Sequence, residues 1–167
     1  MGALLLGSFV LVSPLLASEP SAGLSGAEQA EYLTELKRLQ QTQDERQALL
    51  GHCNELLQTY ALSAAYQVGQ ARRQDLSYQL RLGEPGELLL REEVRGPSGS
   101  DVAVRNQRIG LYGVDPFVRY DCPLSGISCV LFNPHDGSPL LSIVRDHQGA
   151  AELAKALSFL IRNLQKG

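Results

Sequence analysis

Three cysteines, Cys53, Cys122 and Cys129, are the residues whose chemistry says most about this chain. Cys122 and Cys129 enclose PLSGIS, a Pro/Gly turn whose ends can approach to the Cα separation of about 5.5 Å that a disulfide requires. We therefore predict a Cys122–Cys129 disulfide that closes a short loop. Because sequence alone does not determine connectivity, pairing of Cys53 with either of the other two is the alternative. Left unpaired, Cys53 is a small hydrophobe on the buried stripe of a helix.

Histidines and carboxylates that could bind a metal or catalyse hydrolysis occur around residues 134–147, where His135, Asp136 and His147 lie. None of them has a CxxC or HxxxH spacing, so we expect no metal ion. Asp136 lies in a predicted turn, and Asp146 precedes a helical pattern, where it suits an N-cap. The chain has no GxSxG, GxxxxGK[ST] or GxGxxG motif, so we expect neither a cofactor nor catalysis.

Arginine and tyrosine recur between residues 105 and 120. Guanidinium groups pair bidentately with carboxylates, so a polar sheet face here could bind an acidic partner. The candidate partner-binding residues are Arg105, Arg108, Arg119, Tyr112 and Tyr120. A merely solvated strand face is the competing interpretation. Nucleic acid is not an expected partner, because the net charge is −3 and basic residues are interspersed with acidic ones.

The N-terminus is almost continuously apolar over residues 3–17, ALLLGSFVLVSPLLA. This run is too short to cross a bilayer, which takes about 20 residues, but it matches the core of a signal peptide. We therefore predict a signal peptide over residues 1–17 and a flexible linker over 18–26. The mature protein would then be periplasmic or secreted, with no membrane span. Two features depart from the pattern, since no Lys or Arg precedes the run and Leu15 stands where a small residue is preferred. A buried core element is the alternative.

Hydrophobic periodicity predicts the elements that position these residues. Residues 27–73 have helical spacing, with a break near 41–44 where Thr42 could cap a second helix; one long helix is the alternative. Residues 76–145 predict an antiparallel sheet of about five or six strands, with turns at 83–86 and 133–138. Residues 148–165 predict an amphipathic helix packed on the sheet. Residues 27–167 are thus expected to form a single α+β domain.

These features favour an exported, non-catalytic accessory or binding protein that recognises another protein or an envelope component. We expect it to bind through the helical N-terminal half and the open edges or exposed face of the sheet. One alternative is a small envelope hydrolase with a site around residues 134–147, and another is a carrier of a small apolar ligand. An enzyme or carrier needs a deep pocket, whereas a binding module needs a broad exposed surface.

Overall fold

The computed structural model describes residues 26–167, which form an α+β fold. The three α-helices are α1 (Gly26–Leu39), α2 (Glu45–Thr59) and α3 (His147–Gln165), and a 3-10 turn, η1 (Ala64–Tyr66), follows α2. The first antiparallel sheet contains β1 (Asp75–Leu82), β2 (Glu87–Arg95) and β3 (Val102–Gly110) in that order. The second, also antiparallel, contains β4 (Tyr120–Asp121), β5 (Ser128–Phe132) and β6 (Pro139–Val144). The predicted signal peptide and residues 18–25 of the predicted linker lie outside the described residues.

The strands form two three-stranded sheets, so the prediction of one sheet with five or six strands is wrong. The chain leaves the first sheet after Gly110 and enters the second at Tyr120. Between them two backbone carbonyls accept hydrogen bonds from the last helix. The side-chain amide of Gln165 donates to the carbonyls of Leu111 and Val114, at 2.7 and 2.8 Å. A contact with a residue some 50 positions away leaves no local sequence pattern, so periodicity could not reveal the division.

The predicted break between two helices is confirmed, with α1 ending at Leu39 and α2 beginning at Glu45. The chain turns at Gln41, whose φ is 52°. Asp44 caps α2, and its carboxylate accepts hydrogen bonds from the first-turn amides, as acidic caps commonly do. Thr42, which we expected to be the cap, instead accepts a bond from the amide of Asp44 at 3.1 Å.

Helix α2 ends at Thr59, although helical spacing predicted a helical segment reaching residue 73. Beyond Thr59 two backbone carbonyls accept hydrogen bonds from strand residues. The carbonyl of Tyr60 accepts from the amide of Val144 at 2.9 Å, and that of Leu62 accepts from Leu76 at 3.0 Å. Because these carbonyls bond to strands, the helical ladder cannot continue through them.

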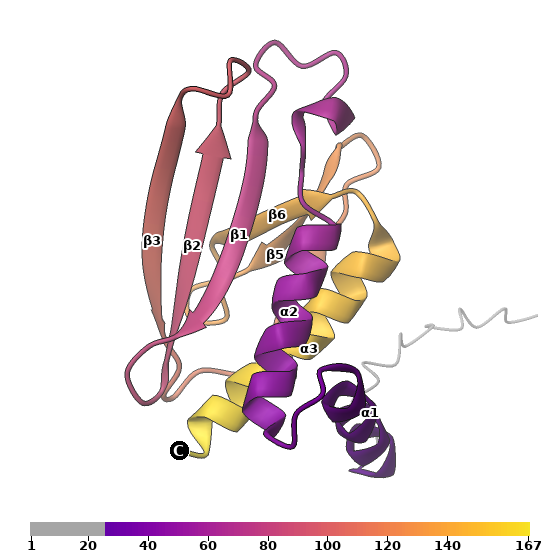
Figure 1. The fold of residues 1–167 in the computed structure, drawn as a ribbon, viewed down its shortest axis with the longest axis vertical. Helices are drawn as coiled ribbons and strands as arrows, with labels where there is room; N and C mark the ends of the chain where they lie inside the picture. The colour runs from indigo at the N-terminus through magenta and orange to yellow at the C-terminus, as the bar shows by residue number, and fades with distance from the viewer. Residues whose placement is uncertain (1–25) are drawn as a thin grey trace, which may run out of the picture.

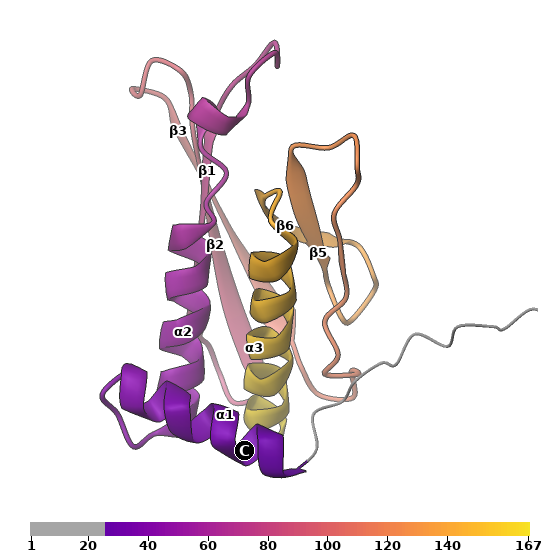
Figure 2. The same cartoon turned by 90° about the vertical axis from the view of Figure 1, so that its right-hand side faces the viewer.

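Helices α2 and α3 lie side by side, α2 against β1 and α3 against β5, while α1 lies across one end of the pair (Figures 1 and 2). One continuous core joins the helices and both sheets. Its largest fully buried side chains include Leu49, Leu57, Leu80, Leu88, Leu131, Ile143, Leu153 and Leu160. The predicted amphipathic C-terminal helix is confirmed, and its N-cap is Asp146, whose carboxylate accepts from the amide of Gly149 at 2.7 Å.

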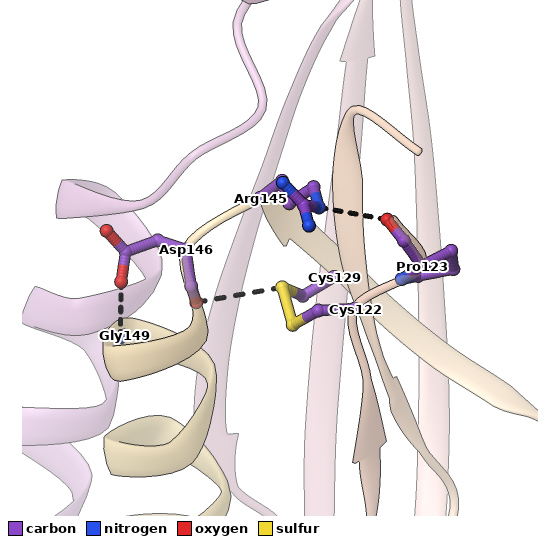
Figure 3. The surroundings of a disulfide bond; sticks show 6 residues. All are labelled: Cys122, Pro123, Cys129, Arg145, Asp146 and Gly149. Carbon is purple, nitrogen blue, oxygen red and sulfur yellow. Dashed lines mark hydrogen bonds between the residues drawn. A yellow bond between two sulfur atoms is a disulfide. The ribbon is translucent and has the colours of Figure 1, made fainter. Parts of the chain in front are cut away.

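The predicted Cys122–Cys129 disulfide is present, and it joins β5 to the residue that follows β4 (Figure 3). Tyr120 pairs with Leu131 and Asp121 with Val130, so the next step of the register puts Cys122 opposite Cys129. Their Cα atoms are 4.2 Å apart, close to the spacing of a non-hydrogen-bonded antiparallel pair. The sulfur of Cys129 also lies 3.6 Å from the carbonyl oxygen of Asp146. The disulfide therefore sits where the second sheet meets the start of α3.

The residues around the disulfide hold its loop against the end of β6. Arg145 donates through Nε to the carbonyl of Pro123 at 2.9 Å, and its backbone amide donates to the carbonyl of Ile127 at 3.0 Å. Cys53 is the free cysteine of the described residues, fully buried on α2, and burial raises the pKa of its thiol. A buried thiol of raised pKa is a poor nucleophile, so Cys53 serves the core.

Thiol labelling tests this connectivity. Native protein purified without reductant should take up no iodoacetamide, and unfolded protein should take it up at Cys53 alone. The variant Cys122→Ala/Cys129→Ala should lose roughly 2.5 kcal/mol of unfolding free energy in urea, because a disulfide that closes a short loop restricts the unfolded chain by about that much. Peptide mapping that links Cys53 to another cysteine would contradict the pairing.

A polar cluster on the three helices was not foreseen from the sequence, and it centres on Glu152 of α3. Its Oε1 accepts a hydrogen bond from the hydroxyl of Tyr32 at 2.8 Å and lies 3.1 Å from Nε2 of His52. Its Oε2 lies 2.5 Å from Nζ of Lys155, which also sits over the Tyr32 ring. Burial alone would raise the pKa of Glu152, but hydrogen bonds from His52, Lys155 and Tyr32 outweigh it and lower the pKa to about 2. The ionised carboxylate thus ties α1 and α2 to α3.

The pKa shift of Glu152 gives its contribution to stability a defined pH dependence. Above the ordinary value of 4.5 the carboxylate is ionised in both folded and unfolded chains, and its bonds contribute fully. As the pH falls from 4.5 toward about 2 the unfolded chain binds a proton first, so this contribution is lost. In urea titrations, Glu152→Gln should lower the unfolding free energy by roughly 2 kcal/mol at pH 7. The difference between parent and variant should shrink below pH 4.5.

The exposed Glu31 of α1 offers a matched control, and Glu31→Gln should leave stability unchanged within about 0.5 kcal/mol. If the difference in unfolding free energy between Glu152→Gln and the parent stayed constant down to about pH 2.5, ionisation of Glu152 would not stabilise the packing of the helices.

Candidate functional site

The outer edge of β1 lies beside α2 and the segment that follows it (Figure 1). Contacts from both of these segments close the edge. The side-chain amide of Asn54, on α2, donates to the carbonyl of Leu80 at 3.0 Å and accepts from its amide at 2.8 Å. This two-bond pairing imitates a neighbouring strand. Further along β1, Leu62 bridges to Leu76 in the antiparallel sense. The fold therefore protects this edge from pairing with another chain.

The other edge of the first sheet belongs to β3, and the register shows which of its groups face outward. Two hydrogen bonds bracket the β2–β3 ladder, from the amide of Gly96 to the carbonyl of Asp101 and from Leu111 to Gly86. Antiparallel ladders alternate hydrogen-bonded with non-hydrogen-bonded pairs, so the odd-numbered residues of β3 bond to β2. The even-numbered residues direct their N–H and C=O groups away from the sheet, and these are Val102, Val104, Asn106, Arg108 and Gly110.

The outward backbone groups of β3 have no hydrogen-bond partner within residues 26–167. The strand is also accessible to solvent, since the residues Val102 and Val104 are 45% and 44% exposed. A nine-residue strand with one open edge is long enough to template pairing with another chain. The contrast with β1 makes this edge the candidate site.

A cleft of about 430 Å³ lies along the C-terminal half of this edge. One wall is formed by consecutive residues from Gln107 to Tyr112, and the other by residues of the β5–β6 turn, Asn133, His135 and Asp136. A sheet face would contribute alternate residues, so consecutive lining residues indicate a cleft along the strand edge. Such a space suits an extended chain laid beside β3.

Tyr112 is held at one end of the cleft by Gly86. Gly86 has φ 75°, and a Cβ at this position would overlap the ring of Tyr112. Glycine is thus required both for the backbone conformation and for the close approach of the ring. Tyr112 remains 61% exposed, so an aromatic surface is available to a bound chain.

Arg105 and Arg108 lie on opposite faces of β3, because they are three residues apart on a strand. Arg105 Nη2 is 3.1 Å from Glu92 Oε2, and Arg108 Nη1 is 3.9 Å from Glu87 Oε1. Both glutamates come from β2, which lies beside β3 on the side away from its open edge. The arginine side chains are 63% and 79% exposed, so their remaining N–H donors can reach another partner.

The other predicted partner-binding residues belong to the second sheet, so the five do not form one face. Arg119 packs against the ring of Phe132 and next to Gly137 of the turn, while Tyr120 pairs with Leu131 in β4. Arg108 and Tyr112 line the cleft. Arg105 lies three residues before Arg108 on the same strand and does not line it.

The residues considered for a hydrolase are separated in the fold. His135 and Asp136 line the cleft, whereas His147 begins α3 at the other end of β6, roughly 20 Å along the strand. Hydrogen bonds from the hydroxyl and amide of Ser138 lower the pKa of Asp136 and commit its carboxylate to the turn. Within residues 26–167 no group of three His, Cys, Asp or Glu side chains is placed to hold a metal ion.

No family model, curated protein or solved structure matches this chain. Among helices α1, α2 and α3, none combines the length and apolar character needed to cross a membrane.

Sequence reasoning named Arg105, Arg108 and Tyr112 but missed what unites them, the open edge itself. Alternating residues predict a strand, yet they do not say which of its edges is paired. The closure of β1 by Asn54 depends on contact across 26 positions, which no local signal could have revealed.

Backbone amide exchange measured by NMR tests the open edge directly. The amides of Val104, Asn106 and Arg108 should exchange roughly tenfold or more faster than those of Arg105 and Gln107, because only the latter donate to β2. The outward-facing amides of Leu76 and Leu80 on β1 serve as internal controls and should be protected by Leu62 and Asn54. Uniform protection along β3 would contradict an open edge.

Proposed function

We propose that this chain is an exported, non-catalytic binding protein that takes up an extended segment of another protein as an added strand beside β3. The single observation that carries this proposal is the asymmetry of the first sheet. One edge is closed by Asn54 and Leu62, while the outward backbone groups of the other edge have no hydrogen-bond partner among residues 26–167. An extended peptide added to such an edge gains backbone hydrogen bonds, each worth about 1 kcal/mol.

Export to the periplasm is part of the proposal, and two features support it. The apolar run at residues 3–17 is typical of a signal peptide. The Cys122–Cys129 disulfide suits an oxidising compartment, since disulfides rarely persist in a reducing cytosol. In this setting, the partner is another envelope protein.

A proline substitution can block the edge without breaking the sheet. Asn106→Pro removes an outward N–H and should fold, because proline is tolerated where a strand faces solvent. Gln107→Pro removes an inward N–H that bonds to β2 and should cost roughly 3 kcal/mol or more. Immobilised parent protein and the matched control Asn106→Thr should both retain a common protein from an envelope extract, and Asn106→Pro should not.

Amide exchange of the complex completes this test, since the retained protein should protect the amides of Val104, Asn106 and Arg108. Retention by folded Asn106→Pro at the level of the parent would show that β3 is not the binding edge. If the parent retains nothing beyond bare resin, the binding function itself is wrong.

A further inference from the structure

We infer that the segment bound at β3 is acidic, runs antiparallel to the strand and carries two acidic residues three positions apart. This inference rests on the proposed strand addition and names the class of segment that the edge selects. It is argued from the charges on β3, from the faces of the strand on which they lie, and from the register of an added strand.

The charge of β3 favours an acidic partner. The strand, VAVRNQRIG, contains two arginines and no acidic residue. Opposite charges across an antiparallel pair stabilise it, whereas like charges destabilise it. A second copy of this chain would bring two more arginines and no carboxylate to the same edge, so self-pairing is disfavoured. A nucleic acid could satisfy the arginines, but it lacks the regular N–H and C=O pattern that the backbone of β3 demands.

Register sets the spacing of the acids. Arg108 and Arg105 differ by 108 − 105 = 3 positions, so the residues opposite them on an added strand are also three apart. Because three is odd, the two acids lie on opposite faces, as the arginines do. Antiparallel pairing is the more stable arrangement per residue and puts the first acid opposite Arg108 and the second opposite Arg105.

Two exposed valines extend the recognition pattern toward the start of β3. Val104 and Val102 stand four and six positions from Arg108, and both side chains lie on the outer face. Apolar residues at the fourth and sixth positions after the first acid would cover them. At the other end Asp136 lines the cleft, so the ligand residue before the first acid should be uncharged.

The peptide TETSEVTVT carries this pattern, with its glutamates opposite Arg108 and Arg105 and its valines opposite Val104 and Val102. Titrated into isotope-labelled full-length protein, it should shift the amide signals of Val104, Asn106 and Arg108. It should bind roughly tenfold more tightly than TKTSKVTVT, in which both charges are reversed. It should also bind more tightly than TETESVTVT, which puts both glutamates on one face, and than the reversed peptide TVTVESTET.

Charge reversal in the protein gives a second readout. Arg108→Glu should lower the affinity for TETSEVTVT. This variant should bind TKTSEVTVT, in which the first acid is replaced by lysine, more tightly than TETSEVTVT. Arg81 is an exposed arginine on the closed strand β1, and Arg81→Glu is the matched control that should leave both affinities unchanged.

The outcomes separate this inference from the function on which it rests. If all the peptides shift the β3 amides with equal affinity, strand addition stands and acidic selection is overturned. If TVTVESTET binds best, the antiparallel direction is overturned. If no peptide shifts these amides, both the inference and strand addition fail.

Discussion

Backbone hydrogen bonding at the two edges of the first sheet is the constraint on which this structure depends. Every open sheet has two edge strands, and each leaves a row of polar groups that water or protein must satisfy. At β1 the fold supplies the partners itself, through the amide of Asn54 and the bridge from Leu62. At β3 it supplies none within the described residues. The same contacts that hold α2 on the sheet therefore decide which edge remains for a partner.

The rest of the molecule holds this edge in place and shapes its surroundings. The disulfide and Arg145 attach the loop between β4 and β5 to the end of β6, which supports the second sheet beside α3 (Figure 3). The β5–β6 turn of that sheet forms the far wall of the cleft along β3. Glu152 joins the three helices through Tyr32 of α1, His52 of α2 and Lys155 of α3.

Features that depend on neighbouring residues were predictable from the sequence. The break between the first two helices, the turns at 83–86 and 133–138, the cap at Asp146 and the disulfide are all confirmed. Features that depend on distant contacts were not. The division into two sheets, the end of α2 at Thr59 and the cluster around Glu152 each involve partners far along the chain. Of the proposed site, the sequence indicated arginines that could meet an acidic partner, without saying on which faces they lie.

The sequence by itself determined the absence of acidic residues from β3. It also indicated most local elements and favoured the Cys122–Cys129 pairing, because each of these depends on residue types within a short window. Only the tertiary structure decided that Asn54 closes β1, that the outer edge of β3 has no partner among residues 26–167, and that His135 and Asp136 lie across a cleft from Arg108. The physical reason is that an edge is a property of the assembled sheet. A strand's residues specify its faces, but whether its outward N–H and C=O groups are paired depends on which distant segments pack beside it.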